Sequence, residues 1–377
     1  MSNDAMASKL RPLLKMPPKR LAECLLDSPV KTRRSARLWL LADTYSHSET
    51  VSPAKIEVKQ ELTEAKVKVE YEENVLSGGA VSTFYSQIGS NIFQPVSPKH
   101  VTAKQPRDWD LIYNEIVKMR ALISTPVDSF GCERLPNSIT PGMSATDPKT
   151  YRFQLLISLM LSAQTKDETN FAAMKTLQEH FVGKGHPGIC LDAVISSTEA
   201  EIDMCIAKVG FHRRKALYIK KSCDILKERF GGEIPKTIEE IVTLPGVGPK
   251  MGHLILQNGW SINSGIGVDV HLHRLAQMWG WVPKSEKPEL TRTTLEDWLP
   301  KQYWADINPL LVGFGQTVCA PKANNCDVCS LANGLCKGVN RKLVNAKLTE
   351  ARLKKLSKQR GDLSGLVKRK FEQDAGW

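Results

Sequence analysis

The stretch Leu244-Pro245-Gly246-Val247-Gly248-Pro249-Lys250 says most about the fold of this 377-residue chain. Glycine tolerates positive φ angles and lets a backbone approach another group closely, so Gly246 and Gly248 predict a tight turn between two helices. The turn leads directly into a helix that starts near Lys250. The first amides of such a helix lack partners and, with the helix dipole, favour an anion such as phosphate. The alternative is a helical corner that uses glycine only for its geometry.

Apolar residues recur at helical spacing on both sides of this turn. This periodicity predicts helices at about residues 109–122, 153–161, 168–181, 213–230, 237–243, 250–258, 270–280, 289–298 and 304–314. Alternating strand patterns bounded by hairpin turns are nearly absent, so we expect an all-α fold. No apolar stretch approaches the roughly 20 residues that span a bilayer, so we do not expect this chain to be a membrane protein.

The formal net charge of +12 is confined to the two ends of the sequence. Residues 1–105 carry +4 and residues 337–377 carry +8, whereas residues 106–336 are neutral. Such an excess points to an anionic partner, with nucleic acid as the leading candidate. Residues 1–105 show no apolar period and are expected to form a disordered extension. Residues 337–377 are expected to form a basic tail.

Basic clusters in the extension bear on localisation. Lys19-Arg20 and the run from Lys31 to Arg37 predict a nuclear import signal, with a solvated basic arm as the alternative. The basic N-terminus also fits a mitochondrial address, so both compartments stay open. Lys59 and Lys68 lie in patterns that resemble attachment sites for a small ubiquitin-like modifier.

Four cysteines form a Cys-x6-Cys-x2-Cys-x6-Cys pattern within 18 residues: Cys319, Cys326, Cys329 and Cys336. Their proximity in sequence favours a metal site over buried thiols. Zinc sites with four thiolates usually contain two Cys-x2-Cys pairs, whereas this chain has one. A compact four-thiolate loop suits a [4Fe–4S] cluster.

The turn, the segment Gly267-Val268-Asp269-Val270-His271 and the cysteine pattern occur in an order that resembles one protein family. The chain resembles the helix–hairpin–helix DNA glycosylases, and among them the endonuclease III family in its eukaryotic form, over residues 106–336. The resemblance implies a six-helix barrel domain at 150–263 that carries the hairpin. A cluster domain would combine 106–149 with 264–336 and hold a [4Fe–4S] cluster.

The resemblance also implies two catalytic residues. Lys250 would attack C1′ of a damaged nucleotide as the neutral amine, and the resulting imine would allow β-elimination. Asp269 would stabilise positive charge on the sugar as the base departs. From the residues alone, an exposed lysine at a helix start is the favoured interpretation of Lys250, and an ordinary N-cap is the commonest use of an Asp such as Asp269. Val270 replaces the Thr often found at this position in the family.

An enzyme that acts on a base must take it out of the duplex, so the resemblance implies residues that fill the gap. Gln164 is the candidate wedge; otherwise it is a polar helix end, with Asp167 capping the next helix. Phe211 and His212 occupy the second loop that family members insert, although a core Phe is common. Arg213 and its basic neighbours Arg214 and Lys215 suit flanking phosphates, as do the amides at Gly246 and Gly248.

The implied function is that of a bifunctional DNA N-glycosylase and AP lyase that removes oxidised pyrimidines from duplex DNA during base excision repair. It would act as a monomer, with repair-protein partners binding through the two ends. The alternatives are a monofunctional glycosylase of the adenine type and a non-catalytic helix–hairpin–helix DNA-binding protein. The last cysteine spacer has six residues where the family typically has five. Trimming residues 1–105 and 345–377 is expected to weaken DNA binding at higher salt but to spare the chemistry.

Overall fold

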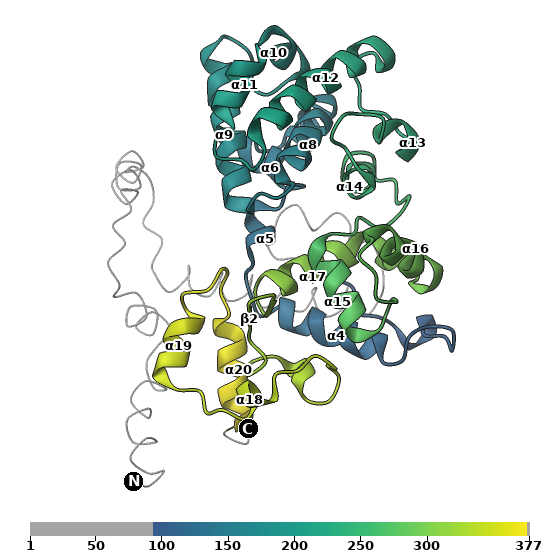
Figure 1. The fold of residues 1–377 in the computed structure, drawn as a ribbon, viewed down its shortest axis with the longest axis vertical. Helices are drawn as coiled ribbons and strands as arrows, with labels where there is room; N and C mark the ends of the chain where they lie inside the picture. Colours follow the sequence, from purple (N-terminus) through teal and green to yellow (C-terminus); the bar gives the residue numbers. More distant parts are fainter. Residues whose placement is uncertain (1–92, 375–377) are drawn as a thin grey trace, which may run out of the picture. The chain divides into compact units, whose positions relative to one another are not determined.

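The computed structural model describes residues 93–374, which fold almost entirely into helices (Figure 1). The helices of the first half are η2 (Pro98–His100), α4 (Trp109–Arg120), α5 (Pro126–Phe130), α6 (Leu135–Ile139), α7 (Met143–Thr146), α8 (Pro148–Ser162), α9 (Asp167–Gly183) and α10 (Leu191–Ser196). They are followed by α11 (Glu199–Cys205), α12 (His212–Phe230), α13 (Ile238–Ile241), α14 (Pro249–Trp260), α15 (Val270–Trp279), α16 (Pro288–Trp298), η3 (Lys301–Tyr303) and α17 (Trp304–Gln316).

The C-terminal part contains a minimal hairpin and more short helices. Strands β1 (Cys319–Ala320) and β2 (Ala323–Asn324) pair antiparallel, with Cys319 opposite Asn324. Helices η4 (Ser330–Ala332), α18 (Arg341–Val344), α19 (Glu350–Leu356) and α20 (Ser364–Asp374) follow. The predicted all-α class is therefore confirmed.

The long helices from α4 to α17 lie where apolar periodicity placed them, and most of the helices that periodicity missed are short, although α20 has 11 residues. One of these is α11, which a capping box fixes: Thr198 Oγ1 accepts from the Glu201 amide, and the Glu201 carboxylate accepts from the Thr198 amide. A helix of one or two turns shows too few repeats for a period to be recognised.

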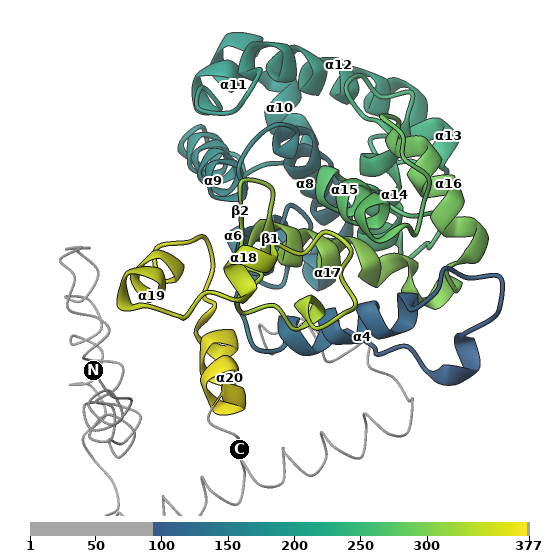
Figure 2. The same cartoon turned by 60° about the horizontal axis from the view of Figure 1, so that its bottom comes forward.

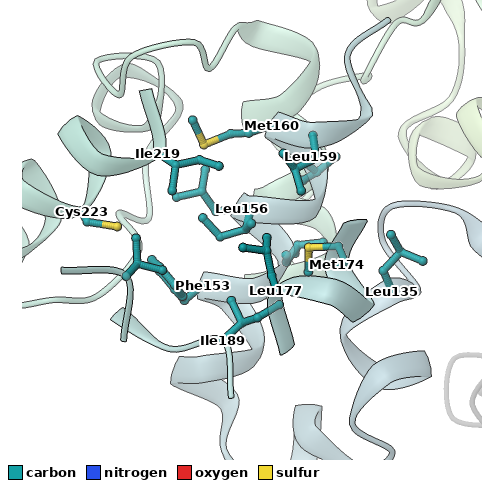
Figure 3. Packing of buried hydrophobic residues seen from close by; sticks show 14 of the residues in the cluster. Leu135, Phe153, Leu156, Leu159, Met160, Met174, Leu177, Ile189, Ile219 and Cys223 are labelled. Atoms are coloured by element: carbon teal, nitrogen blue, oxygen red, sulfur yellow. The ribbon is translucent and has the colours of Figure 1, made fainter. Parts of the chain in front are cut away.

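One hydrophobic core joins the helices from α6 to α14, and we call this part the first lobe. Its buried side chains interdigitate around α8, where Phe153, Leu156 and Leu159 meet Met174 and Leu177 of α9 (Figure 3). Because α8 is apolar on nearly all sides, it lies inside the lobe and not on its surface. The turn 242–248 also belongs to this lobe through Leu244 and Val247.

A second core forms the second lobe. Helix α17 packs on both α4 and α15, so that segments more than 150 residues apart lie side by side (Figures 1 and 2). Trp109, Tyr113 and Tyr303 form an aromatic cluster with edge-on contacts. Helix α5 contacts α17 of this lobe and α9 of the first.

The cores depart from the predicted domain limits at three places. Leu135 and Met143, expected in the cluster domain 106–149, pack in the first lobe. Phe93 and Val96, expected in the extension 1–105, are buried in the second lobe, where Asn114 hydrogen-bonds both backbone groups of Val96. Residues 1–92 of the extension, with Lys59, Lys68 and both basic clusters, lie outside the described residues.

The segment after Cys336 is the third departure, because it is not a solvated tail. Leu356, Leu363 and Leu366 are at most 3% exposed and belong to the second core. Their packing partners in the second core come from distant parts of the sequence, which a local apolar pattern cannot identify. Among residues 93–374, no helix is long and apolar enough to cross a membrane.

Candidate active site

The turn between α13 and α14 has the geometry that its glycines predict. Gly246 has a φ of 80°, and a Cβ atom there would lie 2.5 Å from Cδ2 of Tyr218, so conformation and space both require glycine. Gly248 has a φ of −104° and faces open space. In the described part of the chain no side chain caps α14, so its first amides face outward without a side-chain partner. This arrangement suits a phosphate.

Lys250 is the second residue of α14 and packs close to the segment that leads to Asp269. A Cβ atom on Gly267 would lie 3.2 Å from the backbone oxygen of Lys250. Burial lowers the pKa of His271, an effect that the Asp269 carboxylate opposes and the Lys250 ammonium strengthens. The backbone of Lys250 is therefore in close contact with the segment before Asp269, and the charges of both residues act on His271.

Asp269 is the N-cap of α15. Its Oδ1 accepts a hydrogen bond from the Leu272 amide at 2.7 Å, and the residue is 9% exposed. The cap fixes the orientation of the carboxylate. Because the residue is buried, its charge is screened less by water and interacts more strongly with nearby charges. The ordinary capping role is therefore present, and it is compatible with a catalytic one. Val270, which follows, is 75% exposed and takes no part in the cap.

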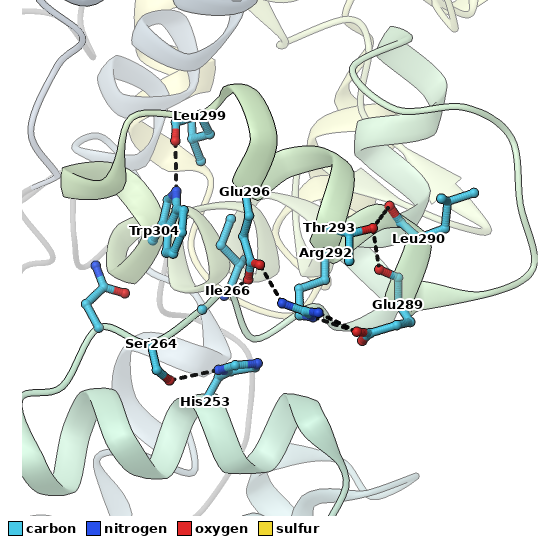
Figure 4. A network of polar contacts seen from close by, with 12 residues as sticks. His253, Ser264, Ile266, Glu289, Leu290, Arg292, Thr293, Glu296, Leu299 and Trp304 are labelled. Atoms are coloured by element: carbon cyan, nitrogen blue, oxygen red, sulfur yellow. Dashed lines mark hydrogen bonds and ion pairs between the residues drawn. The ribbon is translucent and has the colours of Figure 1, made fainter. Parts of the chain in front are cut away.

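A polar network fixes the loop that precedes Asp269 (Figure 4). The Ile266 amide donates to Oε1 of Glu296 at 2.8 Å, and Arg292 pairs with Glu296 and Glu289. On the other side, Ser264 Oγ lies 3.0 Å from Nδ1 of His253 on α14. Because α14 and α16 hold this loop from two sides, the position of Asp269 is set relative to Lys250.

The two candidate DNA-inserting loops lie side by side. A Cβ atom on Gly210 would lie 2.8 Å from the backbone oxygen of Gln164, and the Gly210 amide donates to Thr165 Oγ1 at 3.3 Å. Gln164 and Phe211 both have positive φ angles, 53° and 57°, and both side chains are exposed. Such strain in non-glycine residues is typical of functional positions. Phe211 is 57% exposed and is not a core residue.

The residues directly after Phe211 have different surroundings. Arg213 is exposed in the first turn of α12, as a phosphate contact requires. His212 Nδ1 lies 2.5 Å from Oδ1 of Asp203, so a partner within the protein already holds its ring.

Lys215, expected at a phosphate, is instead buried. Its Nζ donates to the carbonyl oxygens of Leu161 and Ala163 at 2.8 and 2.6 Å, and burial lowers its pKa to about 8. Lys215 therefore holds the backbone that leads to Gln164 through these two hydrogen bonds. In the sequence, all members of the basic run 213–215 are expected to be exposed to solvent. Only the tertiary fold shows that Lys215 is buried and holds the backbone before Gln164.

Asp167 is a further residue at the site, and sequence reasoning assigned it only a capping role. It is the first residue of α9, and its Oδ2 accepts from Nε2 of Gln316 in the second lobe at 2.7 Å. Burial raises the pKa of Asp167, which the hydrogen bond from Gln316 and the charges of Arg360 and Lys250 oppose. The Lys250 charge therefore acts on Asp167, whose partners lie too far away in sequence to be foreseen.

The four cysteines converge on one cavity in the second lobe. Its other lining residues are mainly apolar and include Met278, Trp279, Phe314 and Leu331. Arg274 Nη1 lies 3.8 Å from Sγ of Cys319, and the Asn340 amide donates to Sγ of Cys326 at 3.5 Å. Across residues 93–374, no three His, Cys, Asp or Glu side chains are gathered closely enough to hold a metal ion. Four thiols with N–H donors beside two of the sulfurs are the kind of donor set that iron–sulfur clusters use.

The helical fold with its hairpin is typical of one class of DNA repair proteins, and comparison with known proteins identifies the same class. Residues 157–301 match the sequence model described as "HhH-GPD superfamily base excision DNA repair protein". The match includes the hairpin, Lys250 and Asp269.

Relatives narrow the class to one family. An endonuclease III homolog of Schizosaccharomyces pombe is 42% identical over 254 residues, which cover 67% of this chain and 68% of that protein. An endonuclease III-like protein of Gallus gallus is 42% identical over 226 residues, 60% of this chain and 76% of that protein. A solved structure of a trapped endonuclease III–DNA covalent intermediate is 26% identical, with a TM-score of 0.46, over 55% of this chain and 92% of the other. The chain belongs to the endonuclease III family and is a DNA glycosylase of base excision repair.

Proposed function

We propose that this enzyme is bifunctional: it removes oxidised pyrimidines from duplex DNA and then cleaves the strand as an AP lyase. The observation that carries the proposal is the placement of Lys250 in the first turn of α14, against the loop that ends in the buried Asp269. A primary amine beside a fixed carboxylate is the pair that imine chemistry at a sugar requires.

In the proposed first step, Nζ of Lys250 attacks C1′ as the neutral amine. The bond from C1′ to the base breaks, and its electron pair leaves with the base. Asp269 stabilises the positive charge that develops on the sugar. The C1′–O4′ bond then breaks with its electron pair going to O4′, which takes up the proton that the nitrogen loses, and an imine between Nζ of Lys250 and C1′ remains.

The imine then allows strand cleavage. It acidifies the C2′ hydrogen, and removal of that proton expels the 3′ phosphate with the electron pair of the C3′–O bond. Water hydrolyses the imine and returns Lys250 as an amine, leaving an unsaturated aldehyde on the DNA. The exposed Gln164 and Phe211 lie on adjoining loops and would occupy the gap that the extruded base leaves. Hairpin amides and Arg213 would hold the flanking phosphates.

Product analysis tests this proposal and distinguishes its alternatives. With a duplex that contains thymine glycol, we expect strand breaks that end in the unsaturated aldehyde, formed without heat or alkali. An intact abasic site would instead indicate a monofunctional glycosylase. Binding of the duplex without any base release would indicate a non-catalytic DNA-binding protein.

We further propose that Cys319, Cys326, Cys329 and Cys336 hold a [4Fe–4S] cluster. Its role would be structural: it would tie the loop 319–336 together beside Lys337 and Arg341, which are exposed for contact with DNA. The cavity that all four cysteines line and the two N–H groups near their sulfurs support this. Nucleus and mitochondrion are the compartments we propose, since the basic N-terminal clusters fit either.

Iron content tests the cluster. The purified protein should contain about four iron atoms per chain and be coloured, because Fe–S clusters absorb visible light. Cys329→Ser should lose most of the iron, whereas Cys205→Ser, which changes a half-buried thiol in the first lobe, should keep it. Zinc in place of iron, or full iron in Cys329→Ser, would contradict the assignment.

A further inference from the structure

The C-terminal segment beyond the cysteine loop is anchored at two points on the second lobe. At the first, Arg352 forms two hydrogen bonds of 2.7 Å with the carboxylate of Asp327, whose side chain is 3% exposed. Close by, Gln359 and Asn325 exchange side-chain hydrogen bonds of 2.6 and 3.0 Å. The chain is thus fixed just before residue 360.

The second anchor follows immediately. Ser124 and Asp362 exchange backbone hydrogen bonds of 3.2 and 2.8 Å. Gly361 has a φ of 80°, and a Cβ atom there would lie 2.3 Å from the backbone oxygen of Ser124, so only glycine permits this close approach. Leu363 and Leu366 are buried directly after it. Arg360 therefore projects from a backbone that is held on both sides.

The side chain of Arg360 reaches the first lobe. Its Nη2 donates to Glu168 Oε2 at 2.9 Å, its Nε and Nη2 donate to Glu168 Oε1 at 3.2 and 3.1 Å, and its Nη2 lies 3.8 Å from Oδ2 of Asp167. Asp167 and Glu168 begin α9, whose buried residues pack in the first lobe. The contact therefore connects the C-terminal segment of one lobe with the start of a helix in the other.

This contact lies next to the groups that the proposed reaction uses. Asp167 accepts the hydrogen bond from Gln316 and is within electrostatic reach of Lys250. The exposed Gln164 precedes Asp167 by only three residues. The start of α9 thus carries a carboxyl group within electrostatic reach of Lys250 and directly follows the candidate wedge, and Arg360 and Gln316 hold it from the second lobe.

We propose that Arg360 is a positioning residue: it fixes the start of α9 against the second lobe and so sets the geometry around Lys250 and Gln164. This inference rests on the proposed function, because the site it adjusts is the proposed lyase site. Arg360 and Glu168 are 39% and 45% exposed, so the pair contributes little to overall stability. Its effect lies in placement, since a displacement of about 1 Å can slow an enzymatic reaction by about 100-fold.

Charge-swap variants of the full-length protein test the proposal on a duplex that contains an abasic site. Arg360→Gln should slow single-turnover strand cleavage by about fivefold, and Arg360→Glu by about tenfold or more, with the melting temperature and the dissociation constant for DNA nearly unchanged. Adding Glu168→Arg to Arg360→Glu restores an ion pair and should recover most of the rate. Lys358→Gln removes the same charge two residues away and should match the wild type.

Hydrogen exchange at the start of α9 gives a readout that does not depend on activity. The amides there should exchange faster in Arg360→Glu and recover in the swapped protein. The proposal would be overturned if Arg360→Gln and Arg360→Glu both kept the wild-type cleavage rate and amide exchange. It would also be overturned if adding Glu168→Arg to Arg360→Glu recovered neither the rate nor the exchange. A rate loss matched by an equal loss of DNA binding would make Arg360 a phosphate contact and also overturn it. If the wild type cleaves nothing, the proposed function fails, and exchange alone decides whether the contact fixes α9.

Discussion

Lys250→Gln is expected to lower the single-turnover rates of base removal and strand cleavage by at least about 10³-fold, because it removes the nucleophile of the reaction. Gln retains a polar side chain of similar length but has no amine that could form an imine. Its fold should be intact. Since a positive charge near a helix N-terminus is unfavourable by about 0.3–1 kcal/mol, the melting temperature should stay level or rise slightly.

A matched lysine variant controls for the loss of charge. Lys284→Gln changes an exposed lysine outside the site and should retain wild-type rates. Rates are measured under single-turnover conditions on a thymine glycol duplex, with melting curves for both variants. If Lys250→Gln cleaved within about tenfold of the wild-type rate, another residue would have to be the nucleophile.

Removing residues 345–377 is expected to destabilise the protein severely, contrary to the expectation from sequence. Burial of Leu356, Leu363 and Leu366 contributes about 5–9 kcal/mol in total, a large part of the 5–15 kcal/mol that typically stabilises a domain. The deletion also removes Arg352 and leaves the buried carboxylate of Asp327 without this partner, which costs about 3–5 kcal/mol. We expect insoluble protein or a melting temperature lowered by more than about 10 °C.

Smaller changes separate packing from charge in this segment. Leu366→Ala should cost about 2–5 kcal/mol in the free energy of unfolding, because the side chain is completely buried. Deleting only residues 375–377 should leave the melting temperature unchanged. A shortened protein without 345–377 that melts like the full chain would show that the segment is a tail after all.

Local features of the molecule could be predicted from sequence because their causes are local. The hairpin requires glycine at Gly246, the cap requires a short acceptor at Asp269, and the long helices show enough repeats of their apolar period. Family resemblance supplied the roles of these residues. The structure adds the placement of Lys250 against the loop before Asp269, and the adjacency of the Gln164 and Phe211 loops.

What sequence could not reveal depends on partners far away in the chain. Asp167 is paired with Gln316, 149 residues later, and Arg360 with Glu168, 192 residues earlier. Lys215 lies in a basic run that looks solvated, yet its ammonium group is buried on carbonyl oxygens of the Gln164 loop. Charge patterns identify surfaces in general but cannot show which member of a run turns inward.

The central claim is that Lys250 forms the covalent intermediate. Its most direct test is to trap the wild-type protein on thymine glycol duplex with borohydride, digest the adduct with protease and locate the modified residue by mass spectrometry. We expect the reduced sugar to be attached to the peptide that contains Lys250, on Nζ of that residue. Attachment to a different residue, or the absence of an adduct from folded, DNA-binding protein, would contradict it.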